Sequence, residues 1–463
     1  MKSRFLLATL CCTLSTAEFE VSLLARQLVE DQCHGPGSLP FTLPDESTKQ
    51  WAELEQGFLN AQVTAYIDGP KAGAASCLSS LKTLLQDKYV LAFSCPLLTA
   101  KLVHQCASLF AFIDQKHRAR VLLQMGNMFK LQSISRWYGQ TQSQKARGEP
   151  FANRYETGMQ SDYSLALTAI FQTTQQPPKN IIPSGHRFAG AEIEIMSICT
   201  YPPDPTSNTV LHSPLPEITP PNHQLYADSF GYRYTVHKTL PKGREGVEAH
   251  YSKMMVVLDR LNERYNEYGS AEGAKNKTSR ASPGLPGSGR SSPPLEHWIL
   301  FVDCDAIFTD FSTPLIDILQ TYTSPTTQFL VAEDTGGINS GVFAVRNSDW
   351  SREYLRKVSV SPYTTAWDQS QFFWEAVKGN LFDFQGPSSS HDFRLPDQVT
   401  LMHQRHLNAF VPPASKDWQA YEWQVGDFIR HFAGCPWQER VCLDMFEATL
   451  IFAEEEWRNV RAR

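Results

Sequence analysis

The clearest candidate for chemistry is a pair of aspartates that follows an apolar run. Residues 297–302 read His-Trp-Ile-Leu-Phe-Val, and Asp303, Cys304 and Asp305 follow them directly. Because side chains alternate along a strand, the two carboxylates would leave the chain on the same side. Open α/β sheets bind ligands at the carboxyl ends of their strands. The pair therefore predicts a site for Mn²⁺ or Mg²⁺, and either ion could bridge a diphosphate.

Three other polar segments follow along the chain. Asn339 lies in the glycine-rich residues 336–341, where the backbone could approach a ligand closely. Asp368 and Gln369 precede an apolar helical pattern, so Asp368 is either a helix N-cap or a site residue. His431 lies in a short strand-like stretch. A lone histidine is more often structural, and only the company of the two aspartates makes His431 a candidate ligand.

The segments that would position these residues alternate between strand and helix patterns. Such alternation predicts an α/β fold with a mostly parallel sheet. A proline-rich loop is expected at residues 202–221. The strand patterns are residues 192–201, 232–237, 297–302, 329–334, 342–346 and 425–435, and the helix patterns are residues 224–229 and 249–265.

Residues 269–294 interrupt this region. Gly, Ser, Pro, Lys and Arg dominate them, and Leu285 is their only sizeable apolar residue. Such a composition cannot bury enough surface to order itself, so we predict a disordered insertion within an α/β domain spanning residues 187–450. The insertion contains an N-glycosylation sequon at Asn276-Lys277-Thr278.

Apolar residues recur at helical spacing within residues 18–176. Trp51, Leu54 and Phe58 recur at helical spacing, and further leucine repeats follow. No residue pattern in this stretch indicates chemistry. We therefore predict an all-helical accessory region ahead of the α/β domain.

The first 17 residues carry a targeting pattern. Lys2 and Arg4 precede a short apolar run that ends in Ser15-Thr16-Ala17, as in a secretory signal peptide. A short membrane anchor and a first buried helix are the alternatives. Among the ten cysteines of the chain, Cys435 and Cys442 are close enough in sequence to pair.

Composition excludes one broad class of partner. The 463 residues include 42 Lys and Arg against 48 Asp and Glu, which gives a net charge of −6. A chain with this balance is not one whose whole surface neutralises nucleic-acid phosphates. Its 42% hydrophobic content is enough for a sizeable packed core.

The ordered set of motifs resembles the GMA12/MNN10 galactosyl- and mannosyltransferase family, which includes the plant xyloglucan xylosyltransferases. Their order and approximate spacing agree from about residue 190 to residue 442. The segments that carry the resemblance are Val302–Ala306, Ile338–Asn347, Trp350-Ser351, Asp368–Ser370 and His431–Cys435.

The resemblance implies a GT-A-like glycosyltransferase with a DxD motif that retains anomeric configuration and acts in the Golgi. It implies a nucleotide-sugar donor, a glycan or glycoprotein acceptor, and Mn²⁺ as cofactor with Mg²⁺ as the alternative. By that match, Asp303 and Asp305 would hold the metal and the nucleotide. His431 would be the third metal ligand.

The same match assigns roles to four further residues. Asn339, Asp368 and Gln369 would face the donor sugar and the acceptor. Gly434 would lie at the donor. Plant members carry a lysine soon after the His-Phe-x-Gly-Cys segment, where this chain has Pro and Trp, and Arg440 is the nearest replacement cation.

Two other functions compete with transfer. An aspartyl-nucleophile phosphatase also uses Asp-x-Asp and Mg²⁺, but it needs a second acid pair, and Gly426-Asp427 is followed by Phe, Ile, Arg and His. A catalytically inactive, glycan-binding relative of the transferases is the other. Intact Asp303, Asp305 and His431 favour the enzyme.

Overall fold

The computed structural model describes most of the chain outside its N-terminus and several connecting segments. The predicted signal segment, Gly434 and Cys435 lie outside the described residues. The described ranges are 45–87, 92–93, 95–146, 188, 190–200, 214–239, 249–278, 296–334, 337–360, 367–382, 395–411, 422–433 and 440–463.

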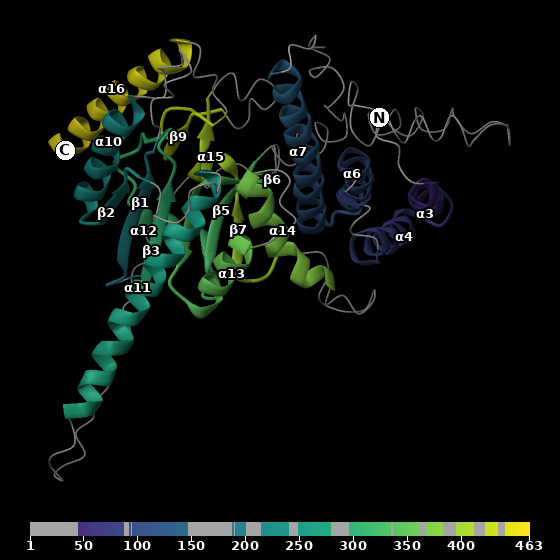
Figure 1. Cartoon of the computed structure of the whole chain (residues 1–463), viewed down its shortest axis with the longest axis horizontal. Coiled ribbons are helices and arrows are strands. Elements are labelled where there is room, and N and C mark those ends of the chain that lie inside the picture. Colours follow the sequence, from purple (N-terminus) through teal and green to yellow (C-terminus); the bar gives the residue numbers. More distant parts are fainter. Residues whose placement is uncertain are drawn as a thin grey trace.

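A six-stranded sheet forms the centre of the protein, in the order β2-β1-β3-β6-β5-β7 (Figure 1). β1 is parallel to β2 and β3, and β5 is parallel to β7, whereas β6 is antiparallel to both β3 and β5. The predicted α/β class with a mostly parallel sheet is thus confirmed. The strands are β1 (Glu192–Ile198), β2 (Arg233–His237), β3 (His297–Val302), β5 (Phe329–Asp334), β6 (Gly337–Arg346) and β7 (Val399–Met402).

A second, three-stranded sheet continues from the carboxyl end of β3. It has the order β4-β9-β8, with β4 at Ala306–Phe308, β8 at Ala409–Phe410 and β9 at Ile429–His431. Ala306 of β4 pairs with His431 of β9. This small sheet therefore brings the far C-terminal histidine beside the residues that follow β3.

Alternate residues of β3 enter two separate hydrophobic cores. Trp298 and Leu300 belong to the core beneath α10 (Leu215–Phe230), α12 (Leu315–Tyr322) and α16 (Arg440–Ala462). Ile299 and Phe301 belong to the core on the other face. There the sheet is covered by α11 (Ala249–Thr278), α13 (Asp349–Val360) and α14 (Trp367–Phe382).

The N-terminal helices pack on that second face. They are α3 (Asp45–Ile67), α4 (Pro70–Lys82), a π-helical turn (Thr83–Asp87), α6 (Pro96–Phe112) and α7 (Lys116–Ala146). α7 lies between the sheet and the other N-terminal helices (Figure 1). Phe93 stacks edge-on against Trp374 of α14, with ring centroids 5.0 Å apart. The helical character predicted for this region is confirmed for the described residues between 45 and 146, and their core is continuous with that of the sheet.

Three sequence-based boundaries were wrong. α11 continues to Thr278, so the first ten residues of the predicted disordered insertion are helical. Ala, Glu and Lys at residues 271–275 favour helix, and extension of an existing helix avoids the cost of nucleation. Residues 279–294 lie outside the described part of the chain. The far end of α11 projects away from the body of the protein (Figure 1).

The other two corrections concern α10 and β6. α10 begins at Leu215, inside the predicted proline-rich loop, and contains Pro220 and Pro221. The fixed φ of proline is compatible with a helix, and burial of Leu215 and Tyr226 offsets the lost hydrogen bonds. β6 begins at Gly337, so most of the expected glycine-rich loop is strand.

Two disulfides join elements that are distant in sequence. Cys77 of α4 is bonded to Cys106 of α6, and Cys199 is bonded to Cys304. Cys442 is also disulfide-bonded. The predicted pairing of Cys442 with Cys435 stays a prediction, because Cys435 is outside the described residues. Among the described helices, none has the length and apolarity needed to cross a membrane.

Candidate metal centre

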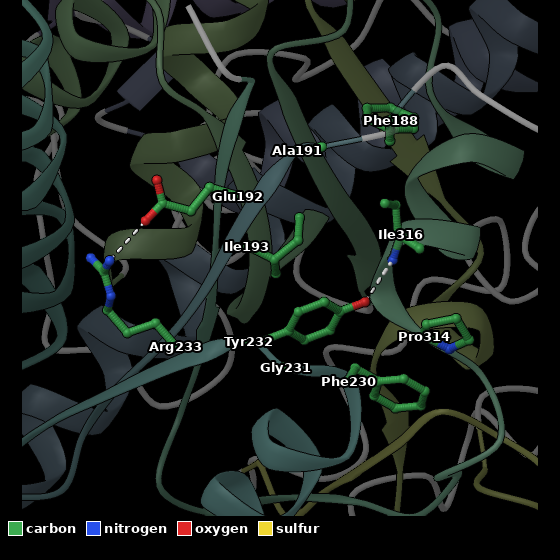
Figure 2. Close-up of a pocket in the computed structure, with 11 residues that line it drawn as sticks. Phe188, Ala191, Glu192, Ile193, Phe230, Gly231, Tyr232, Arg233, Pro314 and Ile316 are labelled. Atoms are coloured by element: carbon green, nitrogen blue, oxygen red, sulfur yellow. Dashed lines mark hydrogen bonds and ion pairs between the residues drawn. The ribbon is translucent and has the colours of Figure 1, made fainter.

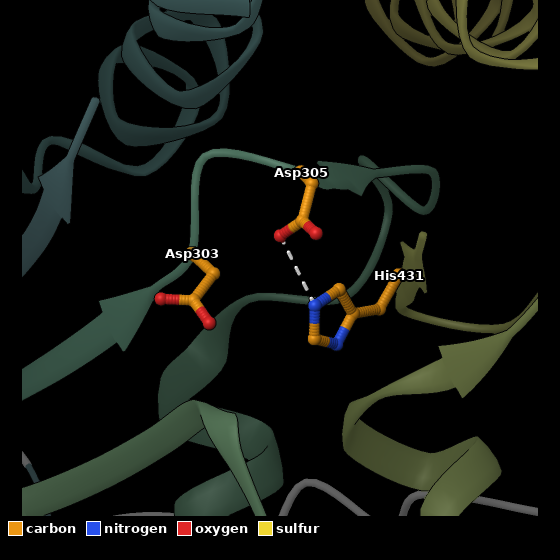
Figure 3. A group of neighbouring side chains, drawn as sticks. All are labelled: Asp303, Asp305 and His431. Carbon is orange, nitrogen blue, oxygen red and sulfur yellow. Dashed lines mark hydrogen bonds and ion pairs between the residues drawn. The ribbon is translucent and has the colours of Figure 1, made fainter. Parts of the chain in front are cut away.

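Asp303, Asp305 and His431 meet at the carboxyl end of β3 (Figure 3). One ligand atom from each residue can be chosen so that all three lie within 4.8 Å of one another. His431 Nε2 is 3.2 Å from Asp305 Oδ1, and His431 Nδ1 is buried with no hydrogen-bond partner among the described residues. The predicted ligand trio is therefore brought together, with ligand atoms still available.

Backbone hydrogen bonds position the three side chains. The amide of Asp303 donates to the carbonyl of Gly341 in β6 at 2.7 Å. The amide of Phe432 donates to the carbonyl of Asp305 at 2.9 Å. Pairing of Ala306 with His431 completes the connection. The trio is thus held by backbone on two sides, from the main sheet and from the small sheet.

Gly341 lets the β6 backbone approach this centre. A Cβ atom at that position would lie 2.3 Å from His431 Cε1 and 2.8 Å from Asp303 Oδ2. No side chain fits at those distances. The centre therefore requires glycine at position 341. The sequence pattern had indicated only that the backbone of residues 336–341 could approach a ligand closely.

Lys253 of α11 is the cation at this centre, and sequence reasoning missed it. Its Nζ is 3.0 Å from Asp303 Oδ2 and 3.3 Å from Asp368 Oδ2, and it donates to the carbonyl of Ser340 at 3.3 Å. The residue is only 4% exposed. Lys253 therefore joins Asp368 of α14 to the trio. The sequence signal that could have identified Lys253 is its position. It lies four residues before Val257, and both residues are on the buried face of an amphipathic helix.

Burial and charge set the protonation of the centre. Burial raises the pKa of Asp303, against the favourable charge of Lys253. Burial also acts to raise the pKa of Asp305, but the charge and hydrogen bond of His431 outweigh it and lower that pKa. Burial acts to lower the pKa of His431, and the neighbouring Asp305 raises it overall. Asp303 and Asp368 likewise raise the pKa of buried Lys253.

Asn339 and Gln369 meet at Asp334, the last residue of β5. Asn339 Nδ2 donates to Asp334 Oδ2 at 3.0 Å, and Gln369 Nε2 is 3.5 Å from the same oxygen. Asn339 Oδ1 accepts from the amide of Gly341 at 2.8 Å. Through Gly341, this amide network is one hydrogen bond from Asp303.

Arg440, the proposed replacement cation, begins α16. Its guanidinium pairs with Asp444 one turn later at 2.9 Å, and the side chain is 74% exposed. No contact within the described residues links it to the trio. Gly434, the other assigned donor residue, lies outside them.

Two contacts from outside the centre support it, and both escaped the sequence reasoning. His223 of α10 hydrogen-bonds the carbonyl of Ala306 at 2.7 Å through Nε2. Arg120 of α7 donates to Glu333 Oε2 at 2.8 Å, directly beside Asp334 in β5. Neither Arg120 nor His223 occurs in a motif that could have indicated such a role.

A separate hollow of about 600 Å³ lies at the amino ends of β1 and β2 (Figure 2). Phe188, Glu192, Tyr232 and Arg233 are among its lining residues. Glu192 and Arg233 begin β1 and β2, whereas the trio follows the carboxyl end of β3, which is parallel to β1. The hollow is therefore distinct from the candidate metal centre.

Similarity to known proteins is concentrated in the C-terminal part of the chain. Residues 315–442 match the model of the galactosyl transferase GMA12/MNN10 family. That segment contains Asn339, Asp368, Gln369 and His431, and it begins shortly after Asp303 and Asp305. The N-terminal helices lie outside it.

Curated relatives come from two yeasts. The probable alpha-1,2-galactosyltransferase gmh1 of Schizosaccharomyces pombe is 31% identical over 26% of this chain and 32% of its own length. Its homologue gmh2 from the same yeast is 30% identical over 26% and 30%. The probable alpha-1,6-mannosyltransferase MNN10 of Saccharomyces cerevisiae is 26% identical over 23% and 27%. The match thus spans about a third of each relative.

One solved structure is also similar. It is a glycosyltransferase involved in the glycosylation of the major capsid of PBCV-1, with a TM-score of 0.34 and 14% identity over 56% of this chain and 99% of that chain. The family model and the yeast relatives agree with the motifs that surround the trio. In this C-terminal region, the chain is similar to the galactosyl transferase GMA12/MNN10 family, and it spans about a third of the length of the curated relatives that it matches.

Proposed function

We propose that this protein is a metal-dependent, retaining glycosyltransferase that moves a sugar from a nucleotide-sugar donor to a glycan or glycoprotein acceptor. The observation that carries the proposal is the convergence of Asp303, Asp305 and His431 within 4.8 Å at a strand end. The similarity of residues 315–442 to the galactosyl transferase GMA12/MNN10 family supports the class of reaction. The retaining outcome rests on the family resemblance alone.

The charges of the centre fit a divalent cation. Three carboxylates, from Asp303, Asp305 and Asp368, face one ammonium from Lys253. This leaves a net negative charge in a partly buried site, which a divalent cation would balance. Two carboxylates with one imidazole favour Mn²⁺ over Mg²⁺, because imidazole suits the softer ion.

Mn²⁺ held there would supply positive charge to a nucleoside diphosphate as it leaves. The protein's own residues do the positioning. Lys253 stays protonated and holds Asp303 and Asp368 in a fixed relation. Asn339 and Gln369 present amide groups beside Asp334, as suits the hydroxyl groups of a sugar.

We further propose that the protein acts in the Golgi lumen. The N-terminal targeting pattern and the family resemblance motivate the assignment. Buried disulfides such as Cys199–Cys304 suit an oxidising compartment. The sequon at Asn276, in the projecting end of α11, is the proposed glycosylation site. The same N-terminal segment is the proposed point of membrane association.

The test is a donor-hydrolysis screen of UDP-galactose, UDP-xylose, UDP-glucose and GDP-mannose with and without Mn²⁺. We expect one donor to be hydrolysed, with dependence on Mn²⁺. Asp305→Asn should lower the rate at least about 100-fold, because it removes a charged metal ligand. Asp317→Asn, on the surface helix α12, is the matched control and should leave the rate unchanged.

Two results would overturn the proposal. One is Mn²⁺ affinity, measured by calorimetry with nucleoside diphosphate present, that is equal in wild type and Asp305→Asn. The other is hydrolysis of a phosphate ester without hydrolysis of any nucleotide sugar. That second result would favour the phosphatase.

A further inference from the structure

The residue between the two metal-binding aspartates is itself covalently anchored. Cys304 forms a disulfide with Cys199, and their Cα atoms are 5.1 Å apart. The parallel strands β1 and β3 pair in register up to Met196 and Phe301. Cys199 and Cys304 each lie three residues further along. The disulfide therefore extends the pairing of the two strands past the point where their hydrogen-bonded register ends.

This is the point where the chain leaves the main sheet. After Val302 it turns through Asp303 and Asp305 and enters β4 of the small sheet. Within the turn, the amide of Ala306 donates to the carbonyl of Asp303 at 3.1 Å. The disulfide fixes the middle of the turn to β1, on the side opposite to β6.

The cysteine and the two aspartates point in opposite directions. Cys199 and Cys304 are each 1% exposed and belong to the core beneath α10 and α12. Asp303 and Asp305 point instead toward His431 (Figure 3). Because Cys304 lies between the two aspartates in this turn, fixing its sulfur in the core restrains the direction in which both carboxylates leave the chain.

Such an anchor matters because the two carboxylates repel each other before a cation arrives. In a buried site this repulsion is stronger than in water. A mobile turn would relieve it by moving the carboxylates apart, and metal binding would then have to restore the geometry. A restrained turn keeps the ligands in place and removes that cost.

We propose that the Cys199–Cys304 disulfide is a positioning element of the metal centre, so that metal affinity depends on its formation. The inference rests on the proposed function of the Asp303, Asp305 and His431 site. In the reduced chain, Asp303 and Asp305 keep their carboxylate groups, but the orientation of these groups is no longer fixed. The centre is complete only after oxidation.

The oxidation itself is ordinary thiol–disulfide exchange. The thiols of Cys199 and Cys304 lose two protons and two electrons in all, and they form one S–S bond. A protein disulfide of the oxidoreductase class accepts them and leaves as a dithiol. Because both sulfurs are buried in the native protein, the exchange takes place during folding.

The experiment compares two pairs of cysteines in the full-length chain. Cys199→Ala/Cys304→Ala removes the proposed positioning disulfide. Cys77→Ala/Cys106→Ala is the matched control, since it removes a buried disulfide of similar Cα separation, 5.6 Å, from the helical region. Mn²⁺ affinity is measured by calorimetry with UDP or GDP present, and thermal unfolding is measured in parallel.

We expect the Kd for Mn²⁺ to rise at least tenfold in Cys199→Ala/Cys304→Ala and to stay within twofold in the control, although both variants melt earlier. Saturating Mn²⁺ should restore donor hydrolysis in the first variant, which a merely structural loss would not allow. An unchanged Kd in Cys199→Ala/Cys304→Ala would overturn the inference. Wild-type protein that binds no Mn²⁺ would instead refute the metal centre itself.

A second measurement applies if the variant does not fold. Wild-type protein is reduced stepwise with a phosphine, and the free thiols are alkylated and identified by mass spectrometry. We expect Mn²⁺ binding to decline in parallel with alkylation of Cys199 and Cys304. A decline that follows Cys77 and Cys106 instead would contradict the proposal.

Discussion

The helical region and the strand-bearing region both bury histidines, but they use them in different ways. In the helices, His104 hydrogen-bonds Asn127 at 3.2 Å, and a Cβ at Gly126 would lie 2.2 Å from its ring. At the strand ends, His431 faces two carboxylates and keeps one ring nitrogen without a hydrogen-bond partner among the described residues. His104 is thus tightly packed and hydrogen-bonded, whereas His431 has a ring nitrogen available for a metal ion.

The contrast shows what separates a site from a core. Burial of a polar group is common to both regions. Among the described residues, the strand-bearing region combines burial with unbalanced charge and available ligand atoms. Carboxyl ends of strands bring side chains from several elements to one edge, whereas packed helices meet along their sides. The helical region should therefore affect stability, and the strand ends should affect chemistry.

The largest effect is expected at Lys253. Lys253→Met keeps most of the side-chain volume but leaves Asp303 and Asp368 without their shared cation. Breaking a buried ion pair costs about 3–5 kcal/mol, so donor hydrolysis should fall at least about 100-fold. Mn²⁺ affinity should not fall, since removal of a cation makes the centre more negative.

Steady-state kinetics and calorimetry check this prediction. Lys253→Arg keeps the charge and should retain more activity than Lys253→Met. Equal activity in wild type and Lys253→Met would mean that the buried ion pair is only structural. The strand ends would then resemble the helical core more closely than we infer.

The sequence predicted the fold class well because the strands are continuous apolar runs. β3 and β5 were predicted within the bounds that the structure has. The errors arose where tertiary packing overrides local preference. Pro220 and Pro221 inside α10 are tolerated because that helix buries Leu215 and Tyr226. α11 extends beyond its amphipathic part because helix elongation needs no new nucleus.

The candidate site was predictable only where its residues share a motif or follow a strand. Asp303, Asp305 and His431 were identified because each lies at or beside a strand. Lys253 was missed because a single lysine in a helix carries no signature until its face is known to be buried. Arg120 was missed because its partner, Glu333, lies 213 residues away.

An intermediate effect is expected for stability at low pH. Burial lowers the pKa of His104 from 6.5 to about 3. The unfolded chain therefore takes up this proton between pH 6.5 and pH 3 while the folded protein does not, so stability falls as pH falls through that window. The loss from this residue should be about 2 kcal/mol between pH 7 and pH 5.

Urea unfolding at the two pH values measures this loss. His104→Gln lacks the titrating group, so the difference in unfolding free energy between pH 7 and pH 5 should be smaller by about that amount. The comparison cancels contributions from other groups, such as His223. An identical pH dependence in variant and wild type would contradict a neutral, packed His104.

The smallest effect is expected at an ion pair that joins the two regions. Arg120 and Gln124 of α7 both donate to Glu333 Oε2, at 2.8 and 3.2 Å. Glu333 is 2% exposed and precedes Asp334, which accepts from Asn339. The helical region therefore holds one end of the strand that carries the amide network.

A double-mutant cycle of Arg120→Met and Glu333→Gln measures this coupling. Each single variant should lower kcat/KM for transfer about fivefold, because the end of β5 loses its fixed partner and Asp334 shifts. The double variant should lose less than the product of the two, since neither charge is then left buried alone. Strictly multiplicative losses would mean that the two side chains act independently. Unchanged kcat/KM in all three variants would confine the helical region to stability, which would make the separation between the two regions complete.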